Sequence, residues 1–323
     1  MLHEATRGFL HSGVGMVGAR SFNWYWNRFK TYVGRPRMVV QTRAVVVDER
    51  ERCETPLFII GPHRSGTSLV RRLFTSHPEI ACPPESFFIA HYAAMLEDRH
   101  VEAGYDGLGY SAEQMRADLA CKAAQLHEAY RVAHGKRIWA DKTPGYSLHL
   151  TGIDRLFGGK PRYVLVLRHP GDVVHSIYRR GWRLNDIADP FESAVLHVRD
   201  CLASILEFEA RHPDRCVRIL YDVLCEQPEA ALAQALEPMG LGFHPAMLRF
   251  AEQDHNFGME DPVIRGTRTI TARSGAWRSL APAQQARIAA VFGPQVEHAR
   301  YWRESKTCDI QCRSAGLPTG QTS

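Results

Sequence analysis

The hydrophobic positions of this 323-residue chain predict strands that lead into helices. A short apolar run at 57–60 has the length of a buried strand, and a polar turn at 61–68 follows it. Between positions 69 and 74 the apolar residues return with the spacing of one helix face, and the pattern ends at His77-Pro78. The segment 57–78 is therefore predicted to be a strand, a tight loop and a helix.

The same pattern recurs further along the chain. The run 162–167 is apolar and rich in β-favouring residues, which is typical of a strand buried on both faces of a parallel sheet. We therefore predict an α/β fold, a P-loop three-layer α/β/α sandwich with a central, mostly parallel sheet. The other predicted elements are strands at 137–140 and 216–221, and helices at 191–211, 230–239, 282–300 and over most of 89–135. A Gly/Tyr interruption at 104–110 breaks the last of these helical stretches. This interruption is predicted to be a flexible rim of an acceptor pocket.

The turn after the first strand has the composition of an anion-binding loop. Gly61 and Gly66 can turn backbone N–H groups inward, and the helix that begins there adds the positive end of its dipole. ATP-binding loops with this glycine spacing carry a lysine where Thr67 stands, whereas here the cation is Arg64, inside the loop. A guanidinium grips two oxygens of an oxyanion, so the loop is predicted to bind phosphate or sulfate.

A second polar loop follows the strand at 162–167 and contains Arg168 and Ser176. In open α/β sheets, ligands bind outside the carboxyl ends of the strands. Both loops are therefore expected at the same edge of the sheet.

Three motifs give the chain a resemblance to a known family. The loop Pro62-His63-Arg64-Ser65-Gly66-Thr67-Ser68 resembles the 5′-phosphosulfate loop of sulfotransferases that use 3′-phosphoadenosine-5′-phosphosulfate (PAPS), and Arg168-His169-Pro170-x-Asp172-Val173-x-x-Ser176 is similar to their 3′-phosphate motif. Arg273-Ser274-Gly275-x-Trp277 looks like the late loop that closes over the cofactor. The bacterial, carbohydrate and tyrosylprotein branch is the most similar. One departure is Tyr221-Asp222-Val223-Leu224, where the family usually has Tyr-Glu-Asp-Leu.

The resemblance implies transfer of a sulfuryl group from PAPS to a hydroxyl or amine, with 3′,5′-adenosine bisphosphate as product and no metal. Arg64 and the backbone of 65–68 would hold the 5′-phosphosulfate, and Arg168 with Ser176 would hold the 3′-phosphate. The expected cofactor-binding residues are Arg64, Ser65, Gly66, Thr67, Ser68, Arg168, Ser176, Arg273, Ser274, Gly275 and Trp277.

Glu85, Arg64 and Lys142 are the expected catalytic residues. Glu85 lies on a turn stiffened by two prolines, at the interval at which related enzymes place a glutamate base. A helix cap is the alternative role for Glu85, and His91 is the alternative base, because the cytosolic branch uses a histidine. Lys142 resembles the lysine of the family's Lys-Thr-Pro and would steady the leaving oxygen, unless it is a surface lysine paired with Asp141. Trp277 could equally pack the late loop or stack on adenine.

Composition narrows the class of protein. The net charge of +5 suits an acidic small molecule, and no dense basic run or basic-aromatic repeat indicates nucleic acid. The eight cysteines form no CxxC pair or zinc spacing, which predicts free thiols in a reducing compartment and no metal site.

The predicted organisation is a lead-in at 1–55, a sulfotransferase domain at 56–304 and a disordered tail at 305–323. The lead-in has no apolar run long enough for a signal peptide or membrane span, so the protein is predicted to be cytoplasmic. Its aromatic and basic residues fit peripheral contact with a membrane or, more simply, a helix packed on the domain. The acceptor is expected to be a small molecule or glycan. A P-loop kinase and a non-catalytic nucleotide-binding protein are the alternatives.

Overall fold

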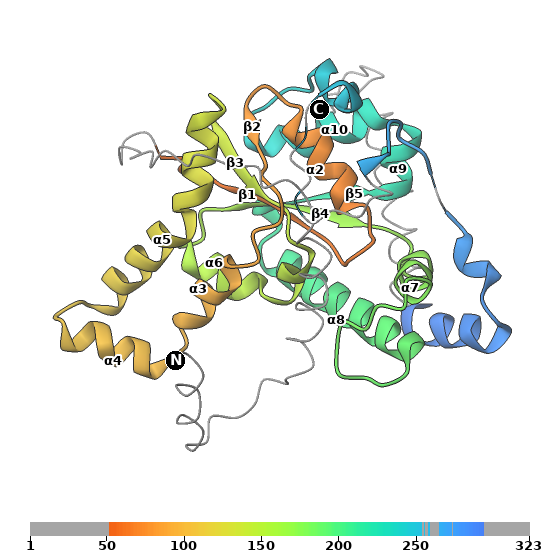
Figure 1. The fold of residues 1–323 in the computed structure, drawn as a ribbon, viewed down its shortest axis with the longest axis horizontal. Helices are drawn as coiled ribbons and strands as arrows, with labels where there is room; N and C mark the ends of the chain where they lie inside the picture. Colours follow the sequence, from red (N-terminus) through yellow and green to blue (C-terminus); the bar gives the residue numbers. More distant parts are fainter. Residues whose placement is uncertain (1–51, 254, 256–257, 259–264, 273, 294–323) are drawn as a thin grey trace, which may run out of the picture. The chain divides into compact units, whose positions relative to one another are not determined.

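A parallel sheet forms the centre of the computed structural model, which describes residues 52–253, 255, 258, 265–272 and 274–293 (Figure 1). The strand order is β2-β3-β1-β4-β5, and each neighbouring pair in this sheet is parallel. In the register of β1 and β4, Leu57 lies opposite Arg162 and Ile60 opposite Leu165. The strands are β1 Leu57–Ile60, β2 Ile80–Ala81, β3 Ile138–Asp141, β4 Arg162–Leu167 and β5 Cys216–Leu220.

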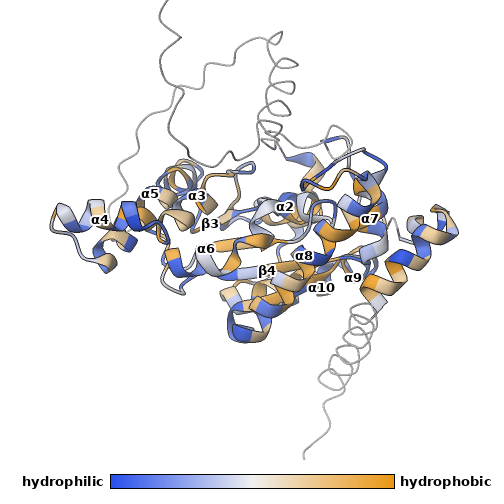
Figure 2. Ribbon diagram, turned by 90° about the horizontal axis from the view of Figure 1, so that it is seen from below, coloured by the Kyte–Doolittle hydropathy of each residue, from blue (hydrophilic) through white to orange (hydrophobic). Residues whose placement is uncertain are grey.

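Both faces of the sheet are buried, because successive side chains of a strand point to opposite sides. Phe58 and Ile60 of β1 belong to one hydrophobic core, and Leu57 and Ile59 belong to the other. Figure 2 shows hydrophobic ribbon at β4 and along α7. The first core is covered by α3 Ile89–Met95, α5 Ala112–Ala133, α6 Leu150–Leu156, α7 Pro170–Tyr178 and α8 Pro190–Arg211, and the second by α2 Thr67–Thr75, α9 Tyr221–Glu226 and α10 Pro228–Leu236.

This arrangement confirms the predicted three-layer α/β/α sandwich. Helices cover both faces of the sheet, and the described strands pair only in parallel. Short 3₁₀ helices complete the fold at η2 Pro144–Leu148, η3 Pro213–Arg215, η4 Glu237–Met239, η5 Pro245–Met247, η6 Phe250–Glu252 and η7 Ala276–Ser279.

The connections of β1 and β4 create the crevice in which a ligand of such a sheet would lie. The two strands are neighbours, but the helix after β1 packs on one face and the helix after β4 packs on the other. Adjacent strands whose connections diverge in this way leave an opening at their carboxyl ends. The loops 61–66 and 168–169 flank that opening.

The predicted interruption at 104–110 is only partly correct. Helix α4, Arg99–Gly107, continues through Gly104 and ends just before Gly109, which has a φ of +83°. Asp98 caps its start by accepting hydrogen bonds from the amides of His100 and Val101. A good N-cap offsets the roughly 1 kcal/mol that a glycine costs inside a helix, which explains why the helix persists.

Several predictions fall outside the described residues: the lead-in up to residue 51, Arg273, and the tail at 305–323. Within the described ranges, no helix combines the length and apolar character needed to cross a membrane. The same residues contain no group of three or more His, Cys, Asp or Glu side chains that could hold a metal ion. The cysteines among them, Cys53, Cys82, Cys121, Cys201, Cys216 and Cys225, are free thiols.

Candidate functional site

The loop between β1 and α2 takes its shape from two glycines. A Cβ on Gly61 would lie 2.6 Å from the carbonyl oxygen of Val166 in β4. Gly66 has a φ of +105°, and a Cβ there would lie 2.5 Å from the ring of Tyr221. Side chains at these positions would push the loop away from its neighbours. The glycines therefore let the loop lie directly against the ends of β4 and β5.

Two features of this loop are suited to an anion. Ser65 is completely buried, and its hydroxyl has no hydrogen-bond partner among the described residues. The start of α2 has no side-chain cap and no acidic residue in its first turn. A buried hydroxyl without a partner is costly, and the first N–H groups of a helix favour negative charge. An oxyanion at this position would satisfy both.

Arg64 and Arg168 come together at the sheet edge. Arg64 has a φ of +73°, which is unusual for a residue with a side chain, and its Nε donates to the Ser176 hydroxyl over 3.1 Å. Arg168 Nη1 donates to the backbone carbonyl of Arg64 over 3.2 Å, and its guanidinium lies 4.7 Å from the centre of the Tyr221 ring. The expectation that the two loops share one edge is thus confirmed.

Glu85 and Lys142 meet beside the start of α2. Lys142 is fully buried, its Nζ donates to the Ser68 hydroxyl over 3.1 Å, and it forms an ion pair with Glu85. A surface lysine paired with Asp141 is therefore the wrong alternative. The cap alternative for Glu85 is also wrong, because the residue before α3 is Phe88 and no side chain caps that helix. The pair brings a carboxylate and an ammonium group next to the loop.

The late loop is held against the start of α7. Both carboxylate oxygens of Asp172 accept backbone N–H groups, from Gly275 at 2.9 Å and from Trp277 at 3.1 Å. The indole of Trp277 stacks on the His169 ring at 5.1 Å between centroids. The Ser274 hydroxyl donates to Asp222. Trp277 therefore packs the loop down, as one of its two predicted roles requires, and contact with adenine remains a prediction.

Two residues at this edge were not predicted to be site residues from the sequence. Tyr221 packs against Gly66 and lies under Arg168, and its hydroxyl donates to the Thr271 carbonyl over 3.1 Å. The available signal was its place at the end of a predicted strand. Asp172 stood within a recognised motif, but its bonds to the late loop depend on the fold.

His63 of the first loop lies against His197 of α8. His63 Nδ1 is 3.2 Å from His197 Nε2, and that nitrogen is 3.5 Å from the Cys201 sulfur. Burial lowers the pKa of His63 to about 3, with smaller contributions from His197 and from the positive charges of Lys142 and Arg64. Burial also lowers the pKa of His197 to about 4. Both rings are therefore neutral at neutral pH.

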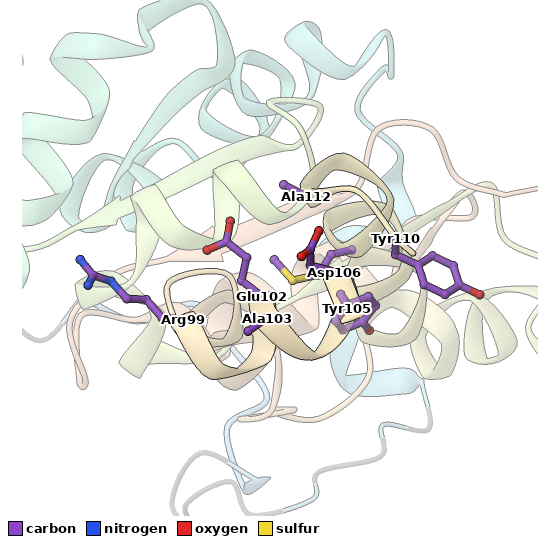
Figure 3. Close-up of a pocket in the computed structure, with 8 residues that line it drawn as sticks. Arg99, Glu102, Ala103, Tyr105, Asp106, Tyr110 and Ala112 are labelled. Carbon is purple, nitrogen blue, oxygen red and sulfur yellow. The ribbon is translucent and has the colours of Figure 1, made fainter. Parts of the chain in front are cut away.

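A separate pocket of about 360 Å³ lies between α4 and α5. Figure 3 shows its aromatic and charged lining, including Tyr105, Asp106 and Tyr110 from the segment predicted to be an acceptor rim. Figures 1 and 2 both place α4 far from α7. The pocket is therefore distant from the α7 side of the candidate site.

Comparison with known proteins identifies the family. A sulfotransferase family model matches residues 56–245. The nodulation protein NoeE of Sinorhizobium fredii is 26% identical over 225 residues, covering 60% of this chain and 51% of that protein, and protein-tyrosine sulfotransferase 2 of Gallus gallus is 27% identical over 222 residues, covering 64% and 57%. The chain thus spans little more than half the length of these curated relatives.

A solved structure shares the fold. The sulfotransferase domain of the Synechococcus PCC 7002 olefin synthase superposes with a TM-score of 0.54 at 24% identity, covering 74% of this chain and 96% of that one. The family model extends over more than half of the sequence, and the chain belongs to the sulfotransferase family.

Proposed function

We propose that this protein transfers a sulfuryl group from PAPS to a hydroxyl or amine of an acceptor. The observation that carries the proposal is the contact between Arg168 and the Arg64 carbonyl, with 3.2 Å between nitrogen and oxygen. It brings two cationic loops from neighbouring strands to the opening between those strands. A nucleotide with anionic groups at two positions could contact both loops at once, which an ordinary ADP could not do equally well.

The residues present fit such a donor. The unpartnered Ser65 hydroxyl, the uncapped start of α2 and the glycine-shaped loop suit a 5′-phosphosulfate. Arg64 would bind the same group from the side, and Arg168 with Ser176 would bind the 3′-phosphate. Bound PAPS supplies the activated sulfuryl group. The late-loop residues Ser274, Gly275 and Trp277 would cover it, together with Arg273, which lies outside the described residues.

Glu85 is the proposed base that takes the proton from the acceptor. Its carboxylate is partly exposed and lies beside the loop, held there by Lys142. Lys142 and Arg64 would stabilise the negative charge that develops on the leaving oxygen, as cations do in the related transfer of phosphoryl groups. His91 is less suited to the role of base, because it is exposed on α3, whereas Glu85 is held beside the loop by its ion pair with Lys142.

The donor class can be tested by thermal unfolding with 3′,5′-adenosine bisphosphate, ADP and ATP. A ligand at 100 times its Kd stabilises the folded state by about 2.7 kcal/mol, so the bisphosphate should raise Tm clearly at concentrations where ADP and ATP do not. Equal or larger shifts with ATP and magnesium would instead favour the kinase alternative.

Transfer itself can be tested with PAPS carrying radiolabelled sulfate. An acceptor panel of p-nitrophenol, a tyrosine peptide and a chitooligosaccharide covers phenolic, peptide and glycan hydroxyls. We expect label on at least one member of this panel. Binding of the bisphosphate without label on any acceptor and without release of sulfate to water would favour the non-catalytic alternative.

A further inference from the structure

A chain of hydrogen bonds runs from helix α5 to the turn that carries Glu85. It begins at His127, whose Nε2 lies 2.8 Å from Asp141 Oδ2. The other carboxylate oxygen of Asp141 accepts the Thr143 hydroxyl, also over 2.8 Å. The Thr143 oxygen in turn accepts the backbone N–H of Ser86 over 3.1 Å. His127, Asp141 and Thr143 are at most 2% exposed, and none has a role in the proposed transfer.

The direction of each hydrogen bond in this relay is fixed. An ionised carboxylate only accepts, so Asp141 must receive hydrogens from both His127 Nε2 and the Thr143 hydroxyl. The single hydroxyl hydrogen of Thr143 is used there, which leaves its lone pairs for the Ser86 amide. His127 Nδ1 is buried and has no partner among the described residues, so Nε2 is the ring nitrogen through which His127 enters the relay. Reversing one bond would leave a buried polar group unsatisfied.

Beyond His127, the relay is formed by residues that are sequence neighbours of the Glu85–Lys142 ion pair. Asp141 and Thr143 are the residues directly before and after Lys142, and Ser86 directly follows Glu85. The relay thus ties the backbone beside the ammonium group to the backbone beside the carboxylate. A second brace supports the same turn, since the Tyr146 hydroxyl lies 2.7 Å from the Ser86 hydroxyl and accepts the Ile89 amide over 2.9 Å.

The local backbone requires such support. Phe87 has a φ of +61°, a conformation that a residue with a bulky side chain rarely adopts. Backbone strain of this kind persists only where surrounding contacts over-determine the conformation, and it is concentrated at functional sites. Without the bond from Ser86 to Thr143, the turn would keep the brace from Tyr146 but lose its tie to the backbone beside Lys142, so we expect the Glu85 carboxylate to move relative to Lys142 and Ser68.

We propose that His127, Asp141 and Thr143 are positioning residues that hold the Glu85 carboxylate and the Lys142 ammonium group in the geometry needed for proton removal from the acceptor. This inference rests on the proposed function. The role of these three residues differs from a purely structural one, because none of them belongs to the loops that are proposed to bind the donor. Loss of the relay should therefore reduce kcat and leave donor binding unchanged.

The test compares Thr143→Val, which keeps the side-chain shape, with Thr143→Ser, which keeps the hydroxyl. Ser147→Ala is the matched control, because Ser147 is a nearby buried residue whose hydroxyl has no partner among the described residues. The acceptor is whichever panel member the wild type labels fastest, or water through sulfate release from PAPS. Displacement of a reacting group by about 1 Å can cost about a hundredfold in rate, so Thr143→Val should lower kcat by about 10- to 100-fold.

The KM for PAPS and the thermal shift by the bisphosphate should stay at the wild-type values in all three variants. Thr143→Ser should retain kcat within about threefold, because the serine hydroxyl can make both bonds of the threonine hydroxyl. Amide hydrogen exchange provides a readout that needs no acceptor. The Ser86 amide should exchange faster in Thr143→Val than in Thr143→Ser or Ser147→Ala.

Several outcomes would overturn the proposal. Thr143→Val with the kcat of Ser147→Ala would show that the hydroxyl positions nothing, and an equal loss in Thr143→Ser would assign the effect to packing. If Thr143→Val does not fold, His127→Gln tests the far end of the relay, where unchanged kcat and unchanged exchange at Ser86 would contradict it. A wild type that binds no bisphosphate and transfers no sulfate would instead refute the proposed function, and the exchange comparison would still report on the relay.

Discussion

Arg168 donates a hydrogen bond from its guanidinium to the backbone carbonyl of Arg64, across 104 positions of sequence. The bond joins the loop after β4 to the loop after β1. It also supports the positive φ of Arg64, a conformation that costs on the order of 1 kcal/mol or more when nothing compensates for it. The two ends of the proposed donor site are therefore mechanically coupled.

This coupling changes what is expected of a substitution at Arg168. From the motif alone, loss of Arg168 should mainly weaken donor binding. Because Arg168 also holds the backbone of Arg64, we expect Arg168→Lys to weaken bisphosphate binding by about tenfold or more and also to lower kcat at saturating PAPS. Titration calorimetry and steady-state kinetics separate the two effects. The exposed Arg155 on α6 gives a matched control, Arg155→Lys, which should behave as wild type. An unchanged kcat in Arg168→Lys would show that the two loops act independently.

Glu85→Gln tests the proposed base. Glutamine keeps a carbonyl oxygen that can still accept from Lys142, but it cannot take a proton, so kcat should fall by about a hundredfold or more. Bisphosphate binding should be retained, because the binding loops are untouched. The control is Glu79→Gln, which alters a carboxylate paired with Arg137 at the surface. Full turnover by Glu85→Gln would exclude Glu85 as the base and would favour His91 in that role.

Asp172→Asn tests how the late loop is held. The carboxylate accepts two backbone N–H groups, from Gly275 and Trp277, whereas an amide side chain offers one oxygen and turns donors toward the other N–H. We expect about tenfold weaker bisphosphate binding, equivalent to about 1.4 kcal/mol, and faster amide exchange at 274–280. The exposed Asp186→Asn serves as the control. Unchanged affinity in Asp172→Asn would mean that this loop does not contribute to donor binding.

The sequence was most informative where the signal was local. Gly61, Gly66 and Arg168 were located because glycine spacing and the ends of apolar strands are visible in a short stretch of residues. The parallel character of the sheet was predicted from the apolar run at 162–167, whereas the strand order β2-β3-β1-β4-β5 was not predicted and comes from the structure. Tyr221 and Asp172 were missed as site residues because their roles come from bonds to Thr271 and to the late loop, between segments separated by 50 to 105 positions. No periodicity or spacing encodes contacts of that kind.

The pair formed by His63 of the first loop and His197 of α8 predicts how stability depends on pH. His63 and His197 have pKa values of about 3 and about 4 in the folded protein, against 6.5 for an unperturbed histidine. Below pH 6.5 the unfolded chain binds protons that the folded protein excludes, so the free energy of unfolding falls as the pH drops from 6.5 toward 4.

Replacing His197 with glutamine should remove part of that dependence. A single histidine of this kind accounts for about 1–2 kcal/mol between pH 7 and pH 5, and His63 should also become easier to protonate once His197 is gone. Urea unfolding of His197→Gln should therefore show a smaller loss of stability between pH 7 and pH 5 than the wild type, whatever its stability at pH 7. The exposed His100→Gln should keep the wild-type dependence. If both variants lose as much stability as the wild type, other groups must be responsible for the sensitivity to acid.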